Sequence, residues 1–124
     1  MLVAYVAGPY RNKSLYFIKQ NIRRAEDVAV RLWNYGYAVI CPHANTNFFD
    51  GAYGMEDDVW LKGDLEIISR CDILVVIPGW ASSKGTKEEI KFARSLGIPV
   101  FFWEKEEQKI VDYKMEVTHE LSKM

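Results

Sequence analysis

Apolar residues along the chain follow two different spacings. Four short runs are continuously apolar, which is typical of buried strands, and between them apolar positions recur every three or four residues, which is typical of helices. The expected strands cover residues 2–7, 37–41, 72–78 and 98–103. The expected helices cover residues 14–36, 57–69, 86–96 and 106–124. Residues 43–56 show neither spacing and contain two glycines, so we expect a long loop there.

The alternation of strands and helices predicts the fold class. Four βα units with apolar strands favour a parallel sheet whose two faces are both covered by helices. Because crossover connections are right-handed, we expect a single Rossmann or flavodoxin-like α/β domain over residues 1–124, with four or five strands in the order 2-1-3-4. Ligands of such sheets bind beyond the carboxyl ends of the strands where the winding direction reverses, here between the first and third strands.

Composition limits the classes of function. Of the 124 residues, 49% are hydrophobic and 14% aromatic, which excludes a disordered chain. The net charge of −1 argues against a broad basic face, so we expect no nucleic-acid polymer as a partner. No apolar stretch approaches the ~20 residues that span a bilayer, and the first residues lead directly into a strand, so we expect a cytoplasmic protein without membrane attachment. Cys41 and Cys71 lie in or beside apolar runs without ligand-like spacing, which predicts two buried free thiols.

The polar segments that follow the first three strands are expected to meet at one edge of the sheet. They are residues 8–11, Pro42 with His43, and residues 79–89. In the last of these, the run SSKG (82–85) precedes a helix, and hydroxyls, glycine and free N–H groups together suit an anion. The run lacks the GxxxxGK[ST] pattern of P-loop enzymes. Arg11 can supply a charged fork to the same anion; the alternative is that Gly8 and Pro9 only turn the chain and Arg11 is solvated.

Three carboxylates require an explanation. Glu88 and Glu89 open the third helix, where acids favour the helix N-terminus, so helix capping is one interpretation. The other is that Glu89 leans toward the crevice, while Glu88 faces solvent or Lys84. Asp64 shares an apolar helix face with residues such as Leu61, so it is either paired or functional.

Taken together, these segments resemble the nucleoside 2-deoxyribosyltransferase superfamily, particularly its small bacterial and phage members and the deoxynucleotide N-glycosidases. The resemblance rests on YVAGPY at the first strand, VICPH after the second, an Asp eight residues before DILVVIPGW, and S-K-G-x3-E, and it covers residues 2 to about 103. It implies an enzyme that cleaves or transfers the N-glycosidic bond of a (deoxy)nucleoside or nucleotide through a covalent glycosyl intermediate, without a metal or redox cofactor.

The resemblance also implies roles for individual residues. Glu89 matches the nucleophile, Asp64 the acid that assists the leaving base, and Tyr5 a tyrosine near the sugar. Other matching positions line the substrate site: Gly8, Pro9, Arg11, His43 and Gly85.

One departure favours a nucleotide over a free nucleoside. Six residues before the nucleophile, the transferases that act on nucleosides tend to carry Asp, and this chain has Ser83. The resemblance implies that this hydroxyl contacts a 5′-phosphate, which an Asp would repel. Loop 43–56 has no counterpart in the family, and its rings at Phe48, Phe49 and Tyr53 either stack on a base or cover the core.

Two alternatives remain open on the sequence. Sheets of this kind also serve as non-catalytic nucleotide sensors, and the discriminating feature is whether Asp64 and Glu89 face one pocket. We also expect at least a homodimer in which aromatic or tail residues are buried between subunits near each site. The aromatic candidates are Trp60 and Trp80, and the weak apolar stripe of the tail consists of Ile110, Met115 and Leu121. The alternative is that the tail packs on its own sheet.

Overall fold

The computed structural model describes residues 1–10, 14–45 and 57–123. Four strands form one sheet: β1 (Val3–Ala7), β2 (Ala38–Ile40), β3 (Ile73–Val76) and β4 (Val100–Phe102). The helices are α1 (Leu15–Asn34), α2 (Pro42–Asn45), α3 (Asp57–Ile68), α4 (Lys84–Ser95) and α5 (Trp103–Ser122), with a single 3-10 turn, η2 (Trp80–Ser82).

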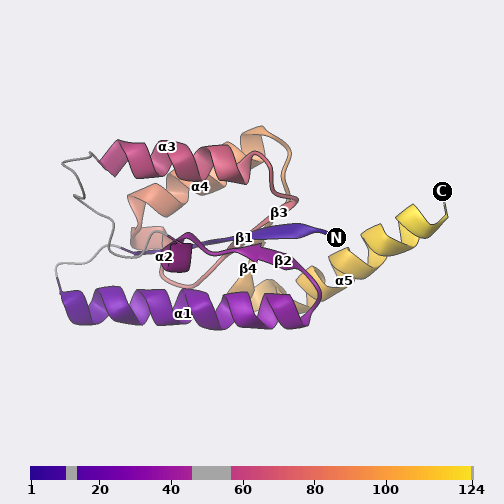
Figure 1. Cartoon of the computed structure of the whole chain (residues 1–124), viewed down its shortest axis with the longest axis horizontal. Coiled ribbons are helices and arrows are strands. Elements are labelled where there is room, and N and C mark those ends of the chain that lie inside the picture. Colours follow the sequence, from indigo (N-terminus) through magenta and orange to yellow (C-terminus); the bar gives the residue numbers. More distant parts are fainter. Residues whose placement is uncertain (11–13, 46–56, 124) are drawn as a thin grey trace.

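The strand order is β2-β1-β3-β4 and every pairing is parallel, as the sequence predicts. Figure 1 shows α1 and α5 on one face of this sheet and α3 and α4 on the other. The two faces follow from the alternation along β1, because Ala4 and Val6 pack with α1 and α5 whereas Tyr5 and Ala7 pack with α3 and α4. The doubly wound α/β fold is therefore confirmed with four strands.

The end of β1 is packed tightly against the segment that follows β3. A Cβ added at Gly8 would lie 2.2 Å from Cγ1 of Ile77, so no other residue fits there without a shift. Gly79 has a φ of +93°, which favours glycine, and its added Cβ would lie 3.1 Å from Cγ of Pro9. These two glycines hold the loops after β1 and β3 side by side.

Two local features differ from the sequence predictions. The segment after β2 begins with the short helix α2 where a loop is expected from residue 43. Helix α5 begins at Trp103, earlier than expected, and its N-cap residue Phe102 donates a 2.9 Å backbone hydrogen bond to the Glu106 side chain. Glu106 itself has non-helical φ and ψ, and α5 is kinked there. Cys71 is buried, as expected, but Cys41 is only half-buried; both are free thiols.

The first half of α5 packs on its own chain. Trp103 and Ile110 belong to the core, and the buried Tyr37 hydroxyl donates a 2.6 Å hydrogen bond to the Ile110 carbonyl. Beyond this point α5 extends away from the sheet (Figure 1), and Met115 and Leu121 are exposed. In the part of the chain that the structure describes, no helix has the length and apolar character needed to cross a membrane.

Candidate active site

A cavity of about 480 Å³ opens beyond the carboxyl ends of the paired strands β1 and β3. The described residues that line it come from the segments after β1, β2 and β3, from α1 and from α3: Gly8, Pro9, Tyr10, Asn21, Arg24, Pro42, His43, Trp60, Leu61, Asp64, Gly79, Ser82, Ser83, Lys84, Gly85, Thr86 and Glu89. This is the crevice expected at the reversal of the winding direction.

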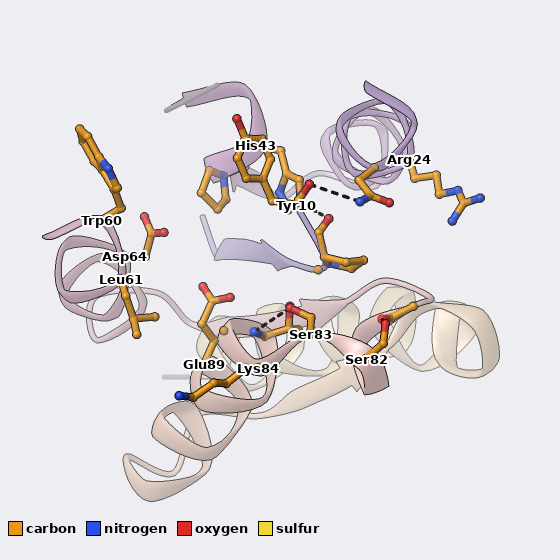
Figure 2. A pocket seen from close by; sticks show the side chains of 17 residues that line it. Tyr10, Arg24, His43, Trp60, Leu61, Asp64, Ser82, Ser83, Lys84 and Glu89 are labelled. Carbon is orange, nitrogen blue, oxygen red and sulfur yellow. Dashed lines mark hydrogen bonds between the residues drawn. The ribbon is translucent and has the colours of Figure 1, made fainter. Parts of the chain in front are cut away.

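Glu89 carries the most perturbed carboxyl group of the cavity. Its side chain is only 7% exposed, and its Oε2 accepts a 2.5 Å hydrogen bond from the hydroxyl of Tyr5 on β1. Burial raises the pKa of Glu89 to about 8; the Tyr5 hydrogen bond opposes this shift, and the nearby Asp64 charge adds to it. Figure 2 shows the carboxyl group directed into the cavity.

Helix capping does not explain this position. The N-cap of α4 is Ser83, whose hydroxyl accepts from the backbone N–H of Thr86, and the first turn of α4 contains no acid. Glu88 is half-buried and lies outside the cavity lining. Of the two adjacent acids, only Glu89 reaches the crevice.

Tyr5 lies beneath Glu89 and is fully buried. Burial, followed by the charge of Glu89, raises the pKa of Tyr5 well above its usual value. The phenol therefore keeps its proton and donates a hydrogen bond to the carboxyl oxygen. Tyr5 holds one oxygen of Glu89 and leaves the other toward the cavity.

Asp64 approaches the same space from α3. Burial raises its pKa to about 6, so roughly a tenth of this carboxyl is protonated at pH 7. Figure 2 shows that the Asp64 and Glu89 side chains reach into the same cavity from α3 and α4, two helices that cover the same face of the sheet. The arrangement places two carboxyl groups with different pKa values in one cavity, and in the empty protein the higher pKa belongs to Glu89 rather than to Asp64.

The start of α4 presents hydroxyl groups to the cavity. Ser83 Oγ accepts two hydrogen bonds from Thr86, one from its N–H at 3.2 Å and one from its hydroxyl at 2.8 Å. A serine oxygen has two acceptor sites, and these two hydrogen bonds occupy both of them. The hydroxyl hydrogen of Ser83 therefore remains available to donate to a bound group. Gly85 also lines the cavity, whereas the Lys84 side chain points away from it (Figure 2).

His43 fixes the loop that follows β1. It is 5% exposed; burial lowers its pKa, so the ring is neutral, and Nε2 donates to the Pro9 carbonyl at 2.9 Å. Its second nitrogen, Nδ1, has no hydrogen-bond partner among the described residues and is an acceptor in this tautomer. The ring of Tyr10 meets His43 edge to face, with centroids 5.8 Å apart. Gly8, Pro9 and His43 therefore lie together at the cavity, as predicted.

Two predicted features lie outside the described residues. They are Arg11 and most of the 43–56 loop, including Phe48, Phe49 and Tyr53.

The cavity also includes residues that sequence reasoning did not assign to it. Asn21 is buried on α1 and donates a 3.3 Å hydrogen bond to the Tyr10 carbonyl, and Arg24 lies one turn further along. The detectable signal was Asn21 itself, a polar residue within the apolar stripe of its helix. Trp60, which was expected near a subunit contact, and Leu61, which was expected on the apolar helix face of Asp64, both border the cavity.

Two solved structures of other proteins have a fold similar to that of this chain. A 2-deoxyribosyltransferase from the psychrotolerant bacterium Bacillus psychrosaccharolyticus superposes with a TM-score of 0.63 at 24% identity, over 81% of this chain and 70% of that one. A conserved protein from Enterococcus faecalis V583 gives a TM-score of 0.66 at 21% identity, over 82% of this chain and 62% of that one, which is less than two thirds of its length. The resemblance to the deoxyribosyltransferases is thereby confirmed at the level of the fold.

Comparison with curated proteins gives no match. Residues 2–103 match a family that is described as a domain of unknown function, DUF7768. This match spans β1 to the first residue of α5 and includes every described residue of the cavity. The chain therefore belongs to the DUF7768 family.

Proposed function

We propose that this protein cleaves or transfers the N-glycosidic bond of a (deoxy)nucleoside 5′-monophosphate. The observation that carries the proposal is that two carboxyl groups, those of Glu89 and Asp64, lie in one cavity at the edge of the sheet where the winding direction reverses. The shared fold with a 2-deoxyribosyltransferase supports the same reaction class.

In the first step, the free carboxylate oxygen of Glu89 attacks C1′ of the sugar. The C1′–N bond breaks and its electron pair leaves with the base, which takes a proton from Asp64. Tyr5 keeps the other Glu89 oxygen in place through its 2.5 Å hydrogen bond. The products of this step are the free base, a glycosyl ester on Glu89 and an ionised Asp64.

In the second step, Asp64 takes a proton from water and the resulting hydroxide attacks C1′. The ester bond to Glu89 breaks, which restores the carboxylate and releases the sugar phosphate. If a second base replaces water, the same step transfers the sugar. Both carboxyl groups return to their initial protonation states.

The preference for a monophosphate is supported by the other side of the cavity. Ser83 retains a free O–H donor at the start of the twelve-residue helix α4, where backbone N–H groups also favour an anion. Arg24 adds a positive charge to the lining. The cavity volume of about 480 Å³ lies within the range typical of sites for small ligands.

The test is incubation of the protein with a panel of nucleosides and nucleoside 5′-monophosphates in ribose and deoxyribose forms, followed by chromatography for free base. We expect base release from at least one monophosphate, with Glu89→Gln inactive and Glu88→Gln active as its matched control. Nucleosides should react more slowly than the matching monophosphates. Release that persists undiminished in Glu89→Gln would remove Glu89 from the mechanism.

A second candidate function, a non-catalytic nucleotide-binding module, is favoured by one observation. The raised pKa of Glu89, about 8, means that most of the empty protein carries a neutral Glu89 near pH 7. A sensor would bind a monophosphate, as seen by calorimetry, and release no base from it at any pH. The same panel therefore separates the two functions.

A further inference from the structure

The cavity is chemically different at its two sides. On the side of α3 it is bordered by Trp60, Leu61 and Asp64, so a single carboxyl group lies beside an aromatic and an aliphatic side chain. On the other side it is bordered by Arg24 and by hydroxyls such as that of Ser83. A ligand with an apolar ring at one end and an anion at the other matches this distribution.

The proposed reaction restricts where the ring must lie. Asp64 can protonate the leaving base only when the two are within hydrogen-bonding distance. Trp60 precedes Asp64 by four residues in α3, so the two side chains are neighbours on one helix face. A base that contacts Asp64 therefore lies near the part of α3 that carries Trp60.

Three other aromatic side chains have ring partners or belong to the core. Trp80 packs on Phe102 with ring centroids 5.1 Å apart, and Tyr10 meets His43 edge to face. Trp103 belongs to the core on the opposite face of the sheet. Among the described residues, Trp60 is the one tryptophan that borders the cavity; it is half-buried, with its indole nitrogen fully buried.

We infer that Trp60 is a specificity-determining residue on which the nucleobase stacks while Asp64 contacts the edge of the base. This inference rests on the proposed function, since it takes the position of the base from the role of Asp64. Stacking on an aromatic ring is tolerant of base identity but increases with overlap, so purines gain more from the bicyclic indole than pyrimidines do.

The experiment uses the Glu89→Gln protein, in which a bound nucleotide is not consumed. Purine and pyrimidine monophosphates, and 1,2-dideoxyribose 5-phosphate as the matching ligand without a base, are titrated by calorimetry and by tryptophan fluorescence. Trp60→Ala should weaken nucleotide binding by about 5- to 150-fold, more for purines, and leave the affinity for the baseless ligand unchanged. Trp60→Phe should retain part of the affinity and lose the fluorescence quenching that a stacked base causes.

Trp33→Phe is the matched control, because Trp33 is 53% exposed on α1 and lies outside the cavity. It should keep both the affinity and the quenching. Unchanged nucleotide affinity in Trp60→Ala overturns the inference, and so does an equal loss for nucleotides and the baseless ligand, which would indicate damage to the whole site.

The outcomes also separate this inference from the proposed function. If the wild-type protein releases no base but binds nucleotides in a way that depends on Trp60, the stacking inference stands and the proposed reaction is refuted. If base is released and nucleotide binding is independent of Trp60, the proposed reaction stands and the stacking inference is refuted. Absence of nucleotide binding would refute both.

Discussion

Replacement of Glu89 by Gln should make the protein more stable, by an amount that depends on pH. Burial raises the pKa of Glu89 from 4.5 to about 8, so the fold disfavours its ionised form. A raised pKa in the folded state means that the stability from this group is complete below pH 4.5 and is lost as the pH rises toward 8. Glutamine cannot ionise, and its amide oxygen can still accept the Tyr5 hydrogen bond.

The magnitude follows from the pKa difference. Each pKa unit corresponds to about 1.4 kcal/mol, so at pH 7 the ionisation of Glu89 in the unfolded chain costs the wild type about 3 kcal/mol. Above pH 8 the cost reaches about 5 kcal/mol, and near pH 4 it vanishes. Asp64 is present in both proteins, so its own titration largely cancels in the comparison.

Urea denaturation followed by tryptophan fluorescence at pH 4.5, 7 and 8.5 measures this difference in the free energy of unfolding. The excess stability of Glu89→Gln should grow with pH over this range. Glu88→Gln changes an adjacent carboxyl group outside the cavity and should show no such growth. A difference between Glu89→Gln and wild type that is constant with pH would refute the claim that burial shifts the Glu89 pKa.

Three further predictions concern catalysis, the phosphate and assembly. Base release requires ionised Glu89, with a pKa of about 8, and protonated Asp64, with a pKa of about 6. The pH profile of kcat/KM should therefore be a bell centred near pH 7 that falls below about pH 6 and above about pH 8. A profile that rises steadily through pH 9 would contradict these roles. Ser83→Asp should weaken monophosphate binding roughly tenfold or more and nucleoside binding far less, because it places a negative charge beside the proposed phosphate dianion. Calorimetry with both ligands measures the two affinities. Equal losses of affinity would show that Ser83 is not at the phosphate site. Light scattering at micromolar concentration should give at least a dimer, with Met115 and Leu121 covered, and a monomer with full activity would refute this.

The sequence alone predicts the parts of this molecule that depend on periodicity and chain direction. Apolar runs and the right-handed crossover rule lead to the observed strand order, and the order in turn brings Gly8, His43 and Glu89 to one edge. The S-K-G-x3-E spacing correctly separates Glu89 from Glu88, because a rotation of about 100° per residue takes the two side chains to different faces of a helix.

Features that arise from long-range contacts were not predictable in this way. The docking of α5 includes a hydrogen bond from the Tyr37 hydroxyl to the carbonyl of Ile110, two residues that are distant in sequence. An apolar stripe cannot reveal such partners. The same reason explains Asn21, whose hydrogen bond to the Tyr10 carbonyl exists only once α1 has packed beside the end of β1.

The most direct test of the central claim is to trap the glycosyl ester on Glu89. A nucleoside monophosphate with fluorine at C2′ of an arabino sugar forms the ester slowly and hydrolyses it more slowly still, because fluorine destabilises the oxocarbenium-like transition state. Intact-mass spectrometry should then show a mass increase equal to the fluorosugar phosphate minus one water, and fragmentation of the tryptic peptide that contains Glu88 and Glu89 should assign it to Glu89. The adduct should form in Glu88→Gln and be absent from Glu89→Gln; an adduct on another residue, or turnover of the natural nucleotide without any adduct, would contradict the account.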